Sequence, residues 1–291
     1  MDNLPVGEDL APSRLVPRHI RRMPSRWLMT ILVAILSSLF FLFLGIPLLS
    51  LLIKEAPATI WSELQQPDVL QALFLSIFTT TLSTLCAVLF GLPVAYVLAR
   101  YRFPGHTLLE ILVTLPTVLP PVVAGVALLL AFGRVGFLGQ YINLFGITIP
   151  FTTTAVVMAQ VFIAAPFFIN NARAGLEQLD LRYEQAAYTL RATPFYAFRR
   201  VVLPLIRPAL SSGIGLAWAR ALGEFGATIT FAGNFPGTTQ TMPIAVYIAS
   251  EFDLDKSIAL AVVLLAVSFG ILLALRLMNI TSKAGGTHRL P

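Results

Sequence analysis

Long stretches without a charged residue dominate this sequence. Six of them cover residues 27–53, 69–99, 111–133, 135–172, 225–250 and 257–275. A helix needs about 20 apolar residues to cross the hydrocarbon core of a bilayer. Only 12% of the 291 residues are charged, which is about half the share that a soluble domain carries. We therefore expect a polytopic membrane protein.

The backbone of a membrane-spanning segment must satisfy its own hydrogen bonds, and this favours helices. We predict an all-α fold with six transmembrane helices, at about 27–53, 69–99, 109–132, 150–171, 206–232 and 256–278. The runs 69–99 and 135–172 exceed one span, so each also includes loop or interfacial backbone. The first run is longer than a signal-peptide core, and we expect it to remain as an anchor.

Basic residues are distributed unevenly between the two sides of this topology. With the N-terminus inside, 16 of the 20 Lys and Arg residues fall in cytoplasmic segments. Lys54, Arg134 and Lys256 fall outside, and Arg220 lies within a span. The asymmetry predicts a protein of the cytoplasmic membrane with both termini in the cytoplasm. Contact with the anionic head groups of the lipid bilayer accounts for the net charge, so no nucleic-acid partner is needed.

The membrane domain is expected at residues 27–279, between a cytoplasmic N-terminal tail at 1–26 and a cytoplasmic C-terminal tail at 280–291. No Walker or GxGxxG nucleotide-binding pattern occurs in the sequence. One cysteine and three histidines in separate segments predict no disulfide and no metal site. We therefore expect this chain to hold no cofactor and no metal.

The longest predicted cytoplasmic loop, at about 172–205, is polar and composed of good helix formers. Asp180 is placed to cap a first helix over 181–192. The Thr193-Pro194 pair then supplies a new cap and a first helical residue. A second short helix follows and ends at Leu203-Pro204. The two helices together predict an elbow that lies across the membrane surface.

The first helix of this elbow carries two adjacent alanines, Ala186 and Ala187. Their small side chains would let a soluble partner approach the backbone, while Tyr183, Glu184 and Arg191 would supply polar contacts. The alternative is a solvated amphipathic linker that binds nothing.

The same stretch resembles the EAA motif of the membrane subunits of binding-protein-dependent ABC importers. That motif is Glu-Ala-Ala, three residues, Gly, nine residues, then Ile-x-Leu-Pro. Here every spacing holds, but Gln185 replaces the Glu, Arg191 the Gly and Val201 the Ile. Arg191 is the main departure, because glycine would allow a tight bend between the two helices.

The resemblance implies that the elbow couples the chain to an ATPase. The residues implied in that contact are Tyr183, Glu184, Gln185, Ala186, Ala187, Tyr188, Leu190, Arg191, Ala192, Thr193, Pro194, Leu203 and Pro204.

Three further segments, at 91–105, 115–129 and 217–247, resemble molybdate, tungstate and sulfate permeases. GEFGAT and AGNFPGTTQTMP within the last of them are more similar to the molybdate branch. The resemblance covers about residues 65–280. It implies the fold of a type I ABC importer permease, a homodimer, two cytoplasmic ATPase subunits and an extracytoplasmic oxyanion-binding protein. It implies a transport subunit rather than an enzyme, with molybdate as cargo and sulfate, thiosulfate or tungstate as alternatives.

Arg220 and Glu224 are charged residues well inside a predicted span. Four residues apart on a helix, they can pair on one face. Buried charges in membranes usually face a bundle interior or a cavity, so the pair would either line the anion route or fix helix packing. Thr228 and Thr230 nearby would either escort an oxyanion through neutral hydroxyls or belong to the end of a helix.

Pro120 and Pro121 interrupt the third predicted span and are expected to kink it, either in a gate or in static packing. Small residues recur at every fourth position of the fifth predicted span, which lets another helix approach closely or smooths a pore wall. These residues are Ser211, Gly215, Ala219, Gly223 and Ala227.

A secondary anion transporter with Glu224 as its proton site is the alternative from another class. Such carriers are usually built from inverted repeats, and the sequence shows no sustained repeat. An intramembrane enzyme is disfavoured because no span carries a catalytic pair.

Overall fold

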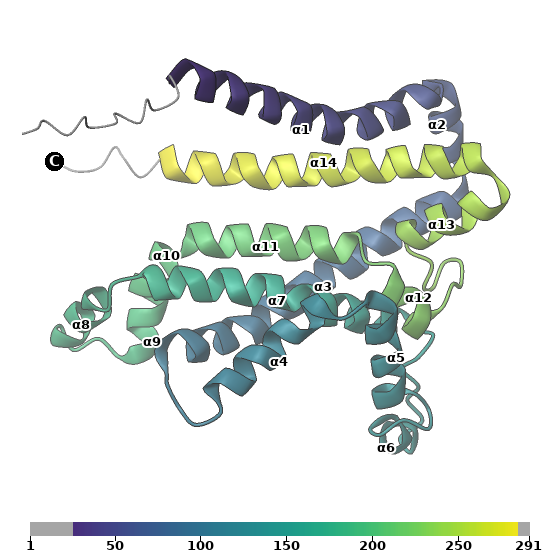
Figure 1. Cartoon of the computed structure of the whole chain (residues 1–291). Helices are drawn as coiled ribbons and strands as arrows, with labels where there is room; N and C mark the ends of the chain where they lie inside the picture. The colour runs from purple at the N-terminus through teal and green to yellow at the C-terminus, as the bar shows by residue number, and fades with distance from the viewer. Residues whose placement is uncertain (1–25, 285–291) are drawn as a thin grey trace, which may run out of the picture. The chain divides into compact units, whose positions relative to one another are not determined.

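The computed structural model describes residues 26–284, and this part of the chain is helical without any strand. The expected tail residues 1–25 and 285–291 lie outside the described residues. In chain order the helices are α1 Arg26–Lys54, α2 Pro57–Leu64, α3 Pro67–Arg100, α4 His106–Val118, α5 Pro121–Phe132, α6 Gly139–Asn143, α7 Thr153–Gln178, α8 Arg182–Thr189, α9 Pro194–Ala197, the π-helix η1 Phe198–Val202, α10 Leu203–Leu205, α11 Arg207–Leu222, α12 Gly226–Ala232, α13 Met242–Phe252 and α14 Leu254–Ala284 (Figure 1).

Four helices of the described part are long and apolar enough to cross a membrane. They are Trp27–Lys54, Pro67–Arg100, Thr153–Gln178 and Leu254–Ala274. Two bent pairs raise the number of spans to six if each pair counts as one: α4 with α5, bent by 119°, and Pro194–Leu205 with α11, bent by 73°. The all-α membrane fold is therefore confirmed, but the third and fifth predicted spans are not single helices.

The third predicted span, 109–132, is wrong as one kinked helix. Leu119 and Pro120 are both extended, with ψ of 135° and 133°, and α5 begins in a new direction at Pro121. Each of these two residues precedes a proline, and a residue before proline is pushed out of the helical region. Two such residues in succession turn the chain instead of kinking it.

The fifth predicted span, 206–232, is also wrong as one helix. Helix α11 ends at Leu222, and α12 begins at Gly226. Gly223 is a poor helix former. The carboxylate of Glu224 then accepts a hydrogen bond from the Ala227 N–H at 2.8 Å, so it caps the new helix as an N-cap side chain does. Local capping therefore replaces the continuous helix.

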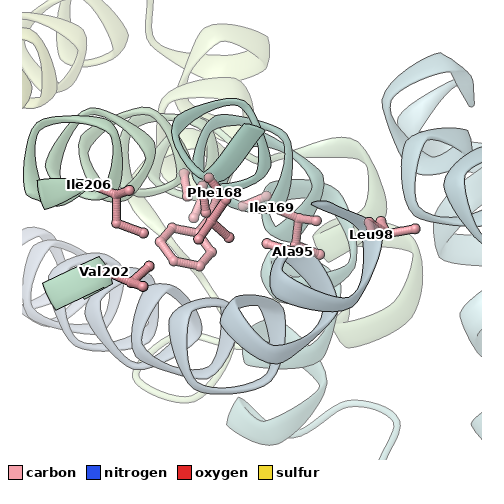
Figure 2. Packing of buried hydrophobic residues seen from close by; sticks show 11 residues of the cluster. Ala95, Leu98, Phe168, Ile169, Val202 and Ile206 are labelled. Carbon is pink, nitrogen blue, oxygen red and sulfur yellow. The ribbon is translucent and has the colours of Figure 1, made fainter. Parts of the chain in front are cut away.

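The described part of the chain divides after Ser50 into two compact units. In the second unit, α7 packs along both α3 and α11. Phe168 of α7 is fully buried at the centre of this packing, among Ala95, Val202 and Ile206 (Figure 2). Small residues bring the backbones close: a Cβ placed on Gly91 would lie 2.8 Å from the Ile169 side chain. Close approach through small residues is the usual basis of helix packing in membranes.

Candidate functional site

The elbow, defined here as residues 180–205, begins with the cap that the sequence predicts. Helix α7 extends to Gln178, so the loop is shorter than expected. The Arg182 N–H donates to Asp180 Oδ1 at 2.9 Å at the start of α8. The Tyr196 N–H donates to Thr193 Oγ1 at 3.3 Å, and Pro194 is the first residue of α9. Both predicted helix starts are confirmed.

The bend between the two helices is a Schellman motif with Arg191 at its left-handed position. Helix α8 ends at Thr189, earlier than the predicted 192, and Arg191 has a φ of 61°. The Arg191 N–H donates to the Tyr188 carbonyl at 3.0 Å, and the Ala192 N–H to the Ala187 carbonyl at 3.1 Å. These two bonds define the motif, whose left-handed residue is usually glycine. The bend that the EAA motif assigns to glycine therefore forms here on an arginine.

Replacing Arg191 with glycine should stabilise this bend. A left-handed residue with a Cβ costs about 1–2 kcal/mol, and the greater freedom of glycine in the unfolded chain offsets part of that gain. We expect Arg191→Gly to raise the free energy of unfolding by about 0.5–1 kcal/mol, measured by thermal unfolding in detergent. Arg191→Ala keeps the Cβ and is the matched control. Equal stability of the two variants would contradict a strained Arg191.

The sequence predicts that the second helix of the elbow ends at Leu203-Pro204, and this prediction is wrong. The helix passes through η1, where the Leu203 N–H donates to the Phe198 carbonyl, and continues to Leu205. The bend of 73° follows, around Ile206. Pro208 explains its position, because a proline cannot donate to the carbonyl four residues earlier and its ring clashes with that carbonyl.

A hollow of about 690 Å³ lies between the two helices of the elbow. Its lining is mainly apolar and includes three alanines. It consists of Tyr183, Ala186, Ala187, Leu190, Arg191, Ala192, Thr193, Tyr196 and Val201. All except Tyr196 and Val201 belong to the predicted coupling set. Ala186 is exposed there, whereas Ala187 is only 9% exposed. The fold thus gathers most of the predicted set around one exposed concave surface.

The other predicted coupling residues lie outside this hollow. Gln185, Tyr188 and Pro194 are exposed on the elbow, and Leu203 and Pro204 belong to α10, just before the bend that leads into α11. Glu184 is only 6% exposed. Its Oε1 lies 2.6 Å from Nη2 of Arg100 at the end of α3. The expectation that Glu184 offers a polar contact to a partner is therefore corrected: the carboxylate faces its own chain.

Arg220 and Glu224 pair as predicted, although they flank a helix break instead of sharing one helix. Arg220 Nη2 lies 2.8 Å from Glu224 Oε2, with Glu224 almost fully buried and Arg220 30% exposed. The other carboxylate oxygen caps α12 through Ala227. Glu224 is therefore held by two partners, one on each side of the break.

Helices α5 and α12 touch at the predicted gate prolines and threonines. A Cβ on Gly226 would lie 2.7 Å from Cβ of Pro121, and one on Gly125 would lie 2.6 Å from Cβ of Thr230. Thr230 donates to the Gly226 carbonyl at 2.8 Å. Thr228 is fully buried, and its hydroxyl has no hydrogen-bond partner among the described residues. Pro120 forms the turn that leads into α5.

The small-residue stripe does not form the packing face of α11 within this chain. The buried small residues of α11 are Gly213, Ala217 and Ala221. The stripe lies on a neighbouring face that is partly or fully exposed at Ser211, Gly215, Ala219 and Gly223, and only Ala227, beyond the break, is buried. The two stripes share the same spacing, so spacing alone did not identify the buried one.

Comparisons with known proteins agree with this arrangement. Residues 87–283 match the family of binding-protein-dependent transport system inner membrane components. The chain is 43% identical over 226 residues to the molybdenum transport system permease protein ModB of Mycobacterium tuberculosis, covering 78% of this chain and 86% of that protein. It is 38% identical over 223 residues to the sulfate transport system permease protein CysT of Salmonella typhimurium, covering 76% and 80%.

A solved structure shares the fold. It is the crystal structure of a bacterial ABC transporter that imports the acidic polysaccharide alginate, with a TM-score of 0.70 and 15% identity, over 87% of this chain and 94% of that chain. The elbow motif, the helical membrane fold and the matched family model lead to one conclusion: this chain belongs to the binding-protein-dependent ABC importer family as a membrane-embedded permease subunit.

Proposed function

We propose that this chain carries molybdate across the cytoplasmic membrane as a homodimer, driven by two cytoplasmic ATPase subunits and supplied by an extracytoplasmic oxyanion-binding protein. The observation that carries the coupling part is the hollow of the elbow, which gathers Ala186, Leu190 and Arg191 on one exposed surface. Molybdate is favoured over sulfate because identity to the ModB relative exceeds identity to the CysT relative.

In the proposed mechanism each ATPase subunit holds one elbow. ATP binding closes the two subunits and draws the elbows together. The spans then tilt, the cytoplasmic side closes, and the route opens toward the loaded binding protein. Only a ligand with different affinity for the two states can shift such an equilibrium, and ATP bound to the partner subunits supplies that difference. This chain itself makes and breaks no bonds.

We further propose that both termini, with tails 1–26 and 280–291, lie in the cytoplasm. The orientation of α3 supports the assignment of the elbow to one side of the membrane. The C-terminal end of α3 meets the elbow through Arg100. Its N-terminal end meets the start of α14, where Lys256 Nζ lies 3.2 Å from Asp68 Oδ2. The N-terminal end of α3 therefore lies beside the N-terminal end of α14, and its C-terminal end lies beside the elbow. The ATPases act inside, so the elbow side is the cytoplasmic side.

We propose that the Arg220–Glu224 pair lies close to the anion route and fixes the break between α11 and α12. Glu224 cancels most of the charge of Arg220, so the pair does not hold a dianion tightly. The exposed prolines 120 and 121 and the partly exposed Thr230 place neutral groups nearby, whereas Thr228 is fully buried inside the chain. A conduit must release what it admits, and neutral groups meet that requirement better than an unpaired arginine.

Reconstitution tests the proposed function. The permease, its ATPase subunits and the binding protein are placed in liposomes, and internal molybdenum is measured over time. We expect uptake that requires both ATP and the binding protein and that excess sulfate reduces only weakly. Uptake that survives ATP removal but stops with an uncoupler would point to a secondary carrier. Preferential uptake of labelled sulfate would assign the chain to sulfate instead.

A further inference from the structure

The last turn of α3 contacts both helices of the elbow. Arg100 pairs with Glu184 of α8 across 2.6 Å, and the two side chains are 10% and 8% exposed. One turn earlier, the ring of Tyr96 meets the ring of Phe198 in η1, edge to face, with centroids 5.3 Å apart. Residues four apart lie on the same face of a helix. One face of α3 therefore contacts both helices of the elbow.

Helix α8 depends on such contacts for its position. It has eight residues, and a helix that short is not stable by itself in water. It packs mainly against α9 and η1, within the elbow. The Arg100–Glu184 ion pair ties it to a membrane-spanning helix. A buried ion pair contributes little net stability, but removing one partner leaves an uncompensated charge. Such a pair is well suited to fix geometry.

Helix α3 connects the elbow with the opposite side of the membrane. It has 34 residues, which corresponds to about 50 Å at 1.5 Å per residue. Near its other end, Ser76 Oγ accepts a hydrogen bond from the Met242 N–H at 2.7 Å. Asp68, in its first turn, pairs with Lys256 of α14. Helix α3 is continuous between these contacts, although Pro93 interrupts its hydrogen bonding, so a displacement of its C-terminal end can reach the outer segments along one helix.

We propose that Arg100 and Glu184, supported by Tyr96 and Phe198, are positioning residues that transmit movement of the elbow to α3. This inference rests on the proposed coupling function and deepens it, since it names the span that the elbow moves. Without the α3–elbow contact, the ATPases would still bind the elbow and hydrolyse ATP. The elbow would then move with less effect on the spans, and fewer anions would cross per ATP.

The test measures uptake and ATP hydrolysis in the same reconstituted vesicles. Glu184→Gln removes the charge with little change in shape, and we expect the number of anions taken up per ATP to fall about tenfold or more. The exchange Arg100→Glu with Glu184→Arg restores the attraction and should return the ratio to near the wild-type value. Arg182→Gln is the matched control, because Arg182 forms an exposed pair with Asp180 on the same elbow, and exposed pairs contribute little.

Three results would overturn the inference. The ratio could stay at the wild-type value in Glu184→Gln, or it could fall equally in Arg182→Gln. The exchange variant could assemble with the ATPases and still show the low ratio; this variant decides the matter if Glu184→Gln does not assemble. Wild-type vesicles without ATP-dependent uptake would instead refute the proposed function, and the inference with it.

Discussion

Replacing Ala186 with tryptophan should abolish ATP-driven anion uptake while the permease remains folded. Ala186 is exposed in the hollow of the elbow, so we expect an indole there to leave the buried core in place. The hollow would be filled, and a partner that contacts the alanine backbone closely would be excluded. We expect recovery of the ATPase subunits with a tagged permease to fall about tenfold or more, which is about 1.4 kcal/mol or more of binding free energy.

The matched control for this variant is Arg182→Trp. Arg182 is the first residue of α8, and its side chain is 89% exposed. The Arg182→Trp variant adds the same indole to the same helix, away from the hollow. Uptake and ATPase recovery should stay close to those of the wild type. Undiminished uptake by Ala186→Trp would show that this surface is not where the ATPase binds.

The second large effect is expected at the break between α11 and α12. Glu224→Gln keeps an oxygen that can cap α12 through the Ala227 N–H, but it leaves Arg220 without its ion pair. Breaking a buried pair is strongly destabilising. Because Arg220 is 30% exposed, we expect a loss of about 2–3 kcal/mol of unfolding free energy, somewhat below the fully buried case. Thermal unfolding of the detergent-solubilised permease measures this loss of unfolding free energy.

A double variant separates packing from transport. Arg220→Met together with Glu224→Gln removes both charges and keeps the cap. If the pair only fixes the helix break, the double variant regains most of the lost stability and takes up anion at nearly the wild-type rate. A stable double variant without uptake would show that a charge of this pair takes part in transport beyond fixing the break.

The helical membrane fold was predictable because its main signal, the absence of charge over long runs, needs no knowledge of tertiary contacts. The caps at Asp180 and Thr193 were predictable for the same reason, since each partner lies two or three residues away. The break in the fifth span was not predicted, and the interruption at the prolines of the third span was predicted only as a kink. Pro120 and Pro121 suggested a kink, but two consecutive residues before proline gave a bend of 119°.

The roles of Glu184 and Glu224 could not be predicted from the sequence. The partner of Glu184 is Arg100, which lies on a distant helix and was counted only among the residues that orient the chain. Glu224 was read as a residue on a helix, whereas its carboxylate caps the next helix and so allows the break. Both roles depend on which groups meet in space, and neither follows from spacing. The Schellman motif at Arg191 was similarly hidden, because arginine is an unusual residue for a left-handed position.

Crosslinking tests the central claim most directly, because Cys86 is the only cysteine of the sequence. In a Cys86→Ala background, Ala186→Cys places one thiol in the hollow, and a thiol-specific photoreactive crosslinker then reports its neighbour in assembled, ATP-bound transporter. The account predicts a product of one permease and one ATPase subunit, which is much weaker when the thiol is placed at Arg182 instead. An assembled transporter that takes up anion normally, yet gives no permease–ATPase product from position 186, would contradict it.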